Sequence, residues 1–410
     1  MLLSNSVINN MDFNKNGEII FKELPDNLPE RILQFGEGNF LRAFCDWMLT
    51  RLLGNGLYDG KIVVVQPIPE GRVDILNEQD GLSTLILRGY RDGKAVEDVE
   101  IINSISRGLN AYTQWDEVLK CAESPLMEFI ISNTTESGIV YRESDKLGDA
   151  PPASFPGKIA ALLYHRYQHF AEKRGSGLVF LPCELSENNG SNLKRIVLLH
   201  AKKWNLPSDF MDWLEKDNLF LNTLVDRTVP GYPFDNAQNI SDSLGYEDKL
   251  LNVAEMFHLW VIEGPEQLAA RLPFDKAGLD VRWVKNLDAY RNQKVRILNG
   301  GHTSSVPAAF LAGLDTVEQM MNDPVTGVYI RDIIYKEIMT ALDGGEQTER
   351  FANSVIERFC NPLIKHYLKS ILLNCSSKYK ARVLPSLLDY IKKEGRFPQR
   401  LCFSFAAFID

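Results

Sequence analysis

Between residues 30 and 205, short apolar runs alternate with longer amphipathic segments. The runs at 31–35, 61–66, 127–132 and 178–181 are rich in isoleucine, valine and phenylalanine and have the length of buried strands. Segments from about 42 to 53, 155 to 174 and 191 to 203 space their apolar residues as helices do. Because strands and helices take turns along the chain, the pattern predicts an α/β fold with a Rossmann-like doubly wound sheet.

The pattern changes after Asn205, and from Asn286 onward it is mostly helical. Apolar positions in segments 309–321, 332–342, 350–359 and 383–393 have helical spacing. A chain of 410 residues suggests two or three domains. We therefore expect a Rossmann-like domain with extensions over residues 1–285 and a mainly α-helical domain over residues 286–410.

A glycine-rich turn joins the first predicted strand to the first predicted helix. The order strand, glycine turn, helix places backbone N–H groups where a pyrophosphate can bind. Leu41 stands at the third glycine of the G-x-G-x-x-G fingerprint, so the motif alone is weak. Gln66 ends the second strand where a ribose-binding carboxylate is expected, which leaves NAD and NADP both open on chemistry.

A polar turn after the third strand adds two more candidates, for which turn formation and helix capping are the alternative interpretation. The candidate cofactor contacts are Gly36, Gly38, Asn39, Phe40, Arg42, Gln66, Thr134 and Glu136.

The stretch from Lys294 to His302 carries a lysine, an asparagine and a histidine beside a glycine pair. A lysine whose pKa is lowered by burial can accept a proton, and an asparagine can donate to a developing oxyanion. At about 100° per residue on a helix, Asn299 lies about 140° from Lys294 and His302 about 80°, so the three can share one broad face. The alternative is a surface lysine followed by an Asn-Gly cap at a helix end.

Net charge and cysteine usage narrow the function classes. A net charge of −9 argues against a nucleic-acid surface. The six cysteines are scattered without a C-x-x-C pair, which indicates reduced thiols in a cytoplasmic enzyme. No signal peptide and no run of 18 apolar residues is visible, so we expect no membrane span.

Two spacings are reminiscent of metal ligands. Residues 12–23 match a calcium-binding EF-hand loop, but they lack a long flanking helix on either side. Glu255 and His258 form an E-x-x-H pair without a second pair nearby. We expect a turn in the first case, and packing with a hydrogen bond in the second, and therefore no metal.

Taken together, the motifs resemble the polyol-specific long-chain dehydrogenases, the mannitol dehydrogenase family, from about residue 31 to the end. Gly36-x-Gly38-x-Phe40-x-Arg42-Ala43 is similar to the family's cofactor turn. Asn189-Gly190, Val225-Asp226-Arg227 and Lys294-x4-Asn299-x2-His302 are similar to its site motifs, in order and at similar separations. Members usually continue for several dozen residues beyond the position of Asp410, so this chain is expected to be shorter than a full member.

The resemblance implies NAD(H), no metal, and reversible hydride transfer to a sugar keto acid of hexuronate breakdown. It implies that Lys294 is the general acid/base, that Asn189 and Asn299 hold the reacting oxygen, that His302 orients the substrate and that Asp226 supports the lysine or the water path near it. A sugar-acid carboxylate also needs cations, and the candidates are Arg358, His366, Lys378 and Arg382, for which a solvated helix face is the alternative.

Three functions remain open at this point: the sugar-acid reaction, a sister sugar specificity with the same chemistry, and a catalytically silent protein that still binds nucleotide. The expected partner is a small sugar acid, with no nucleic acid and no membrane, on a monomer or weak homo-oligomer.

Overall fold

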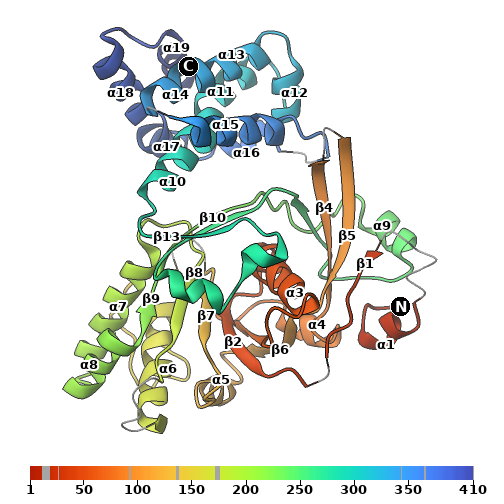
Figure 1. Cartoon of the computed structure of the whole chain (residues 1–410), viewed down its shortest axis with the longest axis vertical. Coiled ribbons are helices and arrows are strands. Elements are labelled where there is room, and N and C mark those ends of the chain that lie inside the picture. Colours follow the sequence, from red (N-terminus) through yellow and green to blue (C-terminus); the bar gives the residue numbers. More distant parts are fainter. Residues whose placement is uncertain are drawn as a thin grey trace. The chain divides into compact units, whose positions relative to one another are not determined.

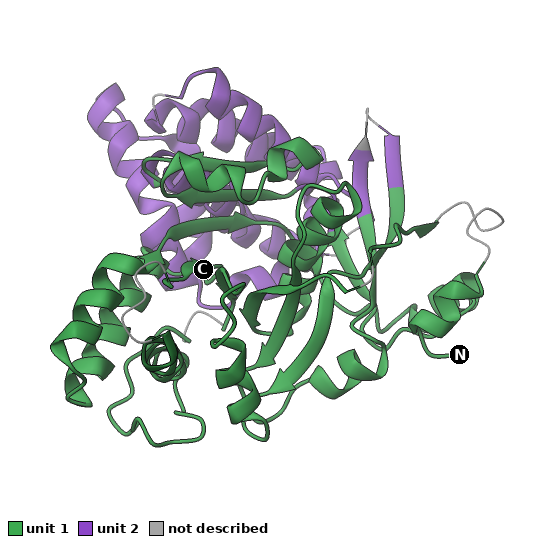
Figure 2. Ribbon diagram, turned by 60° about the horizontal axis from the view of Figure 1, so that its bottom comes forward, with its two compact units in different colours: residues 1–87, 97–254, 258–287 green, residues 88–96, 255–257, 288–410 purple. Residues whose placement is uncertain are grey.

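The computed structural model describes residues 1–11, 19–25, 27–91, 94–134, 138–170, 176–342, 344–363 and 366–409. The chain forms two compact units (Figure 2). Unit 1 comprises Met1–Leu87, Glu97–Ala254 and His258–Leu287, and unit 2 comprises Arg88–Val96, Glu255–Phe257 and Asp288–Asp410. The main division therefore follows residue 287, close to the expected 285. The two short excursions into unit 2 have no counterpart in the sequence pattern.

Unit 1 is built on a six-stranded parallel sheet with the order β6-β3-β2-β7-β8-β9 (Figure 1). The strands are β6 (Ile105–Asn110), β3 (Lys61–Gln66), β2 (Glu30–Phe35), β7 (Phe129–Ser132), β8 (Val179–Pro182) and β9 (Leu219–Phe220). The order reverses direction between β2 and β7, and in such sheets ligands bind at the carboxyl ends beside that switch point. The predicted doubly wound sheet is confirmed.

Helices cover both faces of this sheet, which explains why its strands are apolar throughout. They are α2 (Asn39–Leu41), the π-helical η1 (Arg42–Asp46), α3 (Trp47–Gly54), α4 (Val73–Glu78), α5 (Trp115–Cys121), α6 (Phe155–Phe170), α7 (Asn189–Lys203) and α8 (Ser208–Asp217). Val63 and Val65 point into the core shared with α5 to α8, while the intervening Ile62 and Val64 are buried on the opposite face.

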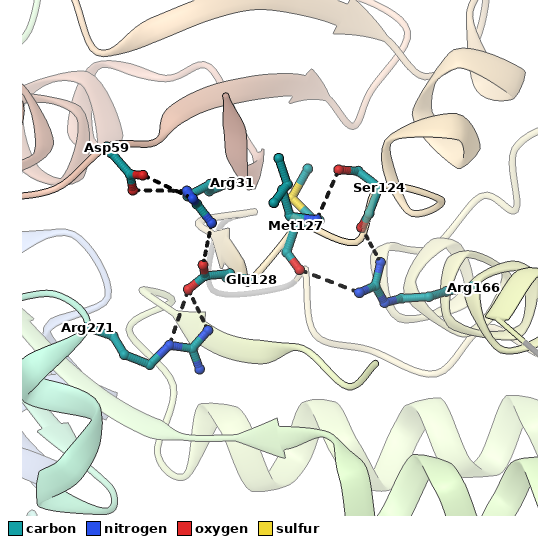
Figure 3. A network of polar contacts seen from close by, with 8 residues as sticks. Arg31, Asp59, Ser124, Met127, Glu128, Arg166 and Arg271 are labelled. Carbon is teal, nitrogen blue, oxygen red and sulfur yellow. Dashed lines mark hydrogen bonds and ion pairs between the residues drawn. The ribbon is translucent and has the colours of Figure 1, made fainter. Parts of the chain in front are cut away.

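Ion pairs close the amino-terminal edge of the sheet (Figure 3). Arg31 at the start of β2 pairs with Glu128, N–O 2.8 Å, and with Asp59, 3.0 Å, and Arg271 reaches the same Glu128. Arg166 of α6 donates to the backbone carbonyl of Ser124 at 2.9 Å. The charges of Arg31, Asp59, Glu128 and Arg271 at this edge are therefore matched to one another.

Two smaller sheets were not predicted. One has the order β1-β5-β4-β11 and the other β10-β12-β13. Their strands are β1 (Ile19–Ile20), β4 (Ser83–Arg91), β5 (Lys94–Ile102), β11 (Asn252–Glu255), β10 (Asn222–Asp226), β12 (Leu259–Glu263) and β13 (Val281–Val284). Helices α1 (Asn5–Asn9) and α9 (Ala237–Leu244) and the 3₁₀ turns η2 (Glu266–Ala270) and η3 (Phe274–Ala277) complete the described part of unit 1.

The main part of unit 2 is helical, as predicted. It contains α10 (Asp288–Gln293), η4 (Lys294–Asn299), α11 (Gly300–Leu311), α12 (Val317–Asn322), α13 (Thr326–Asp332), η5 (Ile333–Ile338), α14 (Met339–Leu342), α15 (Glu346–Phe359), α16 (Leu368–Leu372), α17 (Cys375–Arg382), α18 (Leu384–Glu394) and α19 (Gln399–Ile409), with η4 and η5 π-helical. The single predicted helix over 309–321 is wrong, because the Thr316 side chain and Gln319 form a capping box that starts α12 anew. Within the described residues, no helix has the length and apolarity needed to cross a membrane.

Candidate active site

The glycine turn after β2 packs directly against the end of β7. Gly36 has φ +123°, and a Cβ added there would lie 2.9 Å from the carbonyl oxygen of Asn133. Only glycine fits both the left-handed backbone and the close approach. Gly38 precedes α2, and a Cβ added at Gly38 meets nothing within 4 Å. The turn is therefore tight on the protein side and open on the other, as a pyrophosphate cradle requires.

The side chain of Arg42 stabilises this turn through hydrogen bonds. Its buried guanidinium donates to the carbonyl of Glu37, to Oδ1 of Asn39 at 2.7 Å and to the carbonyl of Leu250 at 3.4 Å. Burial lowers its pKa. Phe40 stacks on Phe44 with the ring centroids 5.0 Å apart. Of the predicted cofactor contacts, Asn39, Phe40 and Arg42 thus build the turn itself.

Gln66 organises the next turn along the carboxyl edge. Its Nε2 donates to the carbonyls of Ile68 and Pro69 at 3.0 and 2.9 Å, and its Oε1 accepts the N–H of Val73 at 3.2 Å. A Cβ on Gly71 would overlap both Gln66 and the carboxylate of Glu37. The expected contact of Gln66 with the ribose of the cofactor remains a prediction.

Glu184 is a residue that sequence reasoning missed. The Glu184 carboxylate, which follows β8, accepts the N–H and hydroxyl of Thr134, each at 3.0 Å, and the hydroxyl of Ser132 at 3.1 Å. It ties the ends of β7 and β8 together, and burial raises its pKa. Its position just past a predicted strand was the one available signal. Glu136 lies outside the described residues.

Asn189 and Asp226 are both buried in unit 1. The Asn189 amide donates to the carbonyls of Pro182, Glu184 and Thr223, at 2.9 to 3.1 Å, and its oxygen accepts the N–H groups of Gly190 and Thr223. The structure thus gives Asn189 a role in fixing the turn between β8 and α7. Asp226 ends β10.

Arg227, which follows Asp226, is a buried residue of unit 1. It donates to the carbonyl of Ala43 at 2.6 Å and stacks over Trp47 with its guanidinium carbon 4.1 Å from the ring centroid. The arginine is therefore buried against unit 1 and does not lie in a solvated loop.

The stretch Lys294–Asn299 forms a π turn, and the chain continues without a break into α11. The N–H of Gly300 bonds to the carbonyl of Val295, five residues earlier. Because a π turn closes over five residues, Lys294 and Asn299 lie nearly above one another, closer in direction than on an α-helix. The helix-end interpretation of Asn299-Gly300 is therefore wrong.

The glycine pair allows other elements of unit 2 to reach this turn. A Cβ on Gly300 would lie 2.9 Å from the carbonyl oxygen of Arg382, at the end of α17. A Cβ on Gly301 would lie 3.1 Å from Cδ1 of Ile334 in η5. The glycines thus serve close helix packing next to the Lys294–Asn299 turn.

His302 lies among aromatic and basic groups. Its ring stacks on Phe359 at 3.9 Å between centroids and meets His366 edge-on at 5.1 Å. Its Nε2 atom is buried, and no described residue bonds to it. Burial, and then the nearby His366, Arg358 and Arg382, hold the pKa of His302 well below its ordinary value. A neutral imidazole with an unused nitrogen is suited to bind a hydroxyl.

The four predicted substrate-binding residues gather in this part of unit 2. The Arg358 side chain is 8% exposed and pairs with Glu255, so the solvated-face alternative fails for it. Burial, with the charges of Arg358 and Lys378, lowers the pKa of His366. Lys378 also donates to the carbonyl of Ile371 at 2.9 Å.

The residues of the E-x-x-H pair are used separately. Glu255 binds Arg358, whereas Nε2 of His258 accepts the N–H of Asp280 at 3.1 Å, and its ring packs edge-on against Trp47. The described residues hold no group of three side chains suited to a metal. Residues 12–18 of the EF-hand-like loop lie outside the described residues.

Residues 30–276 match the mannitol dehydrogenase Rossmann domain, and residues 286–410 match the mannitol dehydrogenase C-terminal domain. The chain belongs to the mannitol dehydrogenase family. The predicted resemblance is confirmed, and this mannitol dehydrogenase family member is an oxidoreductase that acts on CH–OH groups.

Two curated relatives and two solved structures are similar to the chain. Altronate oxidoreductase of Halalkalibacterium halodurans is 49% identical over 385 residues, covering 93% of this chain and 75% of that protein. The enzyme of the same name from Bacillus subtilis is 49% identical, covering 93% and 79%. Substrate-free D-sorbitol dehydrogenase has a TM-score of 0.84 at 22% identity, covering 100% of this chain and 85% of that one. Pseudomonas fluorescens mannitol 2-dehydrogenase, in a ternary complex with NAD and D-mannitol, has a TM-score of 0.79 at 23% identity, covering 100% and 83%, so the fold is shared.

Proposed function

We propose that the protein is an NAD-dependent tagaturonate reductase, or altronate oxidoreductase, with Lys294 as general acid/base. Curated relatives of that name share nearly half of its residues across 93% of the chain. Asn222–Arg227 and Gly231-Tyr-Pro233 are among the stretches that resemble such enzymes. The observation that carries the proposal is the gathering of basic side chains around His302 in unit 2, because an acidic sugar needs cations where a neutral polyol does not.

The glycine turn of unit 1 fits a dinucleotide. The glycine turn after β2 is open at Gly38, and α2 begins there, so backbone N–H groups can face a pyrophosphate. The ends of β3 and β7 flank the turn in the sheet. When bound, NADH supplies the hydride.

Lys294 and Asn299 act on the oxygen of the reacting carbon. In reduction Lys294 gives this oxygen its proton, and in oxidation Lys294 removes the proton from the hydroxyl. Asn299, brought over Lys294 by the π turn, donates to the developing alkoxide, and removal of one such donor typically costs on the order of 10²–10³ in rate. His302 binds a substrate hydroxyl through Nε2.

The remaining predicted residues take supporting roles. Asp226 keeps the supporting role that the family resemblance implies. We assign Asn189 to holding the turn after β8, because its amide is already bonded. Arg382 and Lys378 receive the carboxylate of the sugar acid, and the neutral His366 lies beside Lys378.

A substrate panel tests the proposed function. NADH oxidation is followed with tagaturonate, fructuronate and fructose, and kcat/KM should be highest with tagaturonate. A preference for fructuronate or fructose would show a fructuronate reductase or a mannitol dehydrogenase with the same chemistry. NADH binding without hydride transfer to any of the three would show a catalytically silent nucleotide-binding protein.

A further inference from the structure

A buried ion pair lies in unit 2 beside the residues just described. Nε and Nη2 of Arg358 donate to Oε2 and Oε1 of Glu255, at 2.9 and 2.8 Å. The two side chains are 8% and 5% exposed. Two parallel N–H···O bonds fix the plane of a guanidinium as well as its position. Breaking such a pair leaves a buried charge without compensation.

The chain makes a short excursion to form this pair. Glu255, Met256 and Phe257 belong to unit 2, whereas Ala254 and His258 on either side belong to unit 1. The Arg358 guanidinium lies over the ring of Phe257, 4.1 Å from its centroid. The N–H of Met256 bonds to the carbonyl of Arg88 at 3.1 Å, and the Asn361 amide donates to the same carbonyl at 3.3 Å. All three residues of the excursion thus surround the end of α15.

The end of α15 in turn supports the two imidazoles. Phe359, next to Arg358, stacks on His302 at 3.9 Å, and His366 meets His302 edge-on. The charge of Arg358 acts on both histidines. Because Glu255 already compensates this charge with both of its oxygens, a substrate carboxylate approaching Arg358 would meet a like charge.

We infer that Glu255 is a positioning residue of the substrate site, which fixes Arg358 against Phe257 so that Phe359 and His302 stand at a set place and angle. Arg358 is accordingly a second positioning residue, and the sugar-acid carboxylate is received by Arg382 and Lys378. The inference rests on the proposed function, since it takes His302 to contact the substrate.

The direction in which Glu255→Gln changes KM for tagaturonate shows whether Arg358 is a positioning residue or binds the substrate carboxylate directly. If Arg358 is held in place by Glu255, Glu255→Gln should raise KM for tagaturonate by about tenfold, since a displaced His302 loses its hydrogen bond to the substrate hydroxyl. KM for NADH should change less than about twofold. Glu255→Asp, which keeps the charge, should restore most of the affinity. If Arg358 instead bound the carboxylate, Glu255→Gln would free it and lower KM for tagaturonate.

Two further variants distinguish a change in the substrate site from a general loss of stability. The double variant Glu255→Gln with Arg358→Gln contains no unpaired charge, and its KM for tagaturonate should still be raised about tenfold. Glu337→Gln is the matched control: Glu337 is a buried carboxylate that accepts the N–H groups of Arg400 and Leu401, at 3.0 and 2.8 Å, at the start of α19. Glu337→Gln should lower Tm and leave KM for tagaturonate unchanged.

An NMR titration of the histidines needs no enzymatic turnover, so it tests this inference even if the proposed function is wrong. The chain has six histidines, so the imidazole signals can be assigned by NMR. The charged groups that face His302 are His366, Arg358 and Arg382, and those that face His366 are Arg358 and Lys378. In the double variant the pKa of His366 should rise. An unchanged or lower KM for tagaturonate in Glu255→Gln, an equal rise in KM for NADH, or an unmoved His366 pKa would each overturn the inference.

Discussion

Gly36 and Gly38 show how two glycines of one turn serve different purposes. Gly36 has positive φ and faces a backbone oxygen, so it is needed for the fold. Gly38 has ordinary φ and faces open space, so it is needed only if a ligand lies there. Sequence reasoning gave both the same role, because a glycine carries no sign of which side of it is occupied.

Alanine at the two positions should therefore have different effects. Gly36→Ala should lower the stability by more than about 1 kcal/mol, because alanine at positive φ is strained and its Cβ meets Asn133. Gly38→Ala should leave Tm within a degree or two, a change of a few tenths of a kcal/mol, while it weakens NADH binding. Thermal melts and fluorescence titration with NADH check both. Normal NADH affinity in Gly38→Ala would place the cofactor elsewhere.

Several elements could be predicted from the chain, and several could not. Strands β2, β3, β7 and β8 are continuous apolar runs because helices cover both faces of the sheet, and such runs are visible in a sequence. β5 carries exposed and half-buried polar residues, and β4 opens on the buried polar pair Ser83 and Thr84, so neither strand has a clear apolar pattern. The π turn at Lys294 was invisible because apolar spacing was judged at 100° per residue, and a π turn interrupts that spacing.

The packing around this π turn can be tested with two matched variants, Gly300→Ala and Gly301→Ala. A Cβ on Gly300 meets the backbone carbonyl of Arg382, which cannot turn aside, whereas a Cβ on Gly301 meets the flexible end of Ile334. Gly300→Ala should therefore lower kcat by about tenfold or more through misplacement of Lys294 and Asn299. Gly301→Ala should retain most of kcat. Equal kcat and Tm in the two variants would show that close packing against α17 does not set the turn.

At the scale of the whole molecule, the two units differ in how their charged side chains are arranged. The amino edge of the main sheet carries matched ion pairs, whereas unit 2 gathers cations around two neutral histidines. The sequence showed a net charge of −9 and a basic helical region, and Arg358, His366, Lys378 and Arg382 were chosen as substrate candidates from that region. Glu255 and Glu184 were not found as site residues, because their partners lie far along the chain.

Acid should destabilise the protein through His302 and His366. Both folded-state pKa values lie below the ordinary value of 6.5, chiefly because burial disfavours the charged form. The unfolded chain therefore binds protons first, and stability should begin to fall as pH drops below about 6.5. Tm measured from pH 8 to 5 checks this, and replacing both histidines with asparagine should flatten the curve. An equally steep fall in that variant would assign the effect to other groups.

Cofactor choice should favour NADH over NADPH. The Gln66 side chain is hydrogen-bonded within the turn that follows β3. The carboxylate of Glu37 accepts the backbone N–H of Arg72 and lies beside this turn. A carboxylate at this edge repels a 2′-phosphate, so kcat/KM should be at least about tenfold higher with NADH, or about 1.4 kcal/mol. Glu37→Gln should narrow the difference. Equal rates with both cofactors would mean that a cation such as Arg72 reaches the 2′ position.

The most direct measurement is the turnover of Lys294→Ala with tagaturonate and NADH at saturating concentrations. The account predicts that kcat falls by several orders of magnitude, because the reacting oxygen loses its proton donor, while the Kd for NADH stays within about twofold of the wild-type value. A variant that keeps more than about a tenth of the wild-type kcat would remove Lys294 from the chemistry and contradict the account.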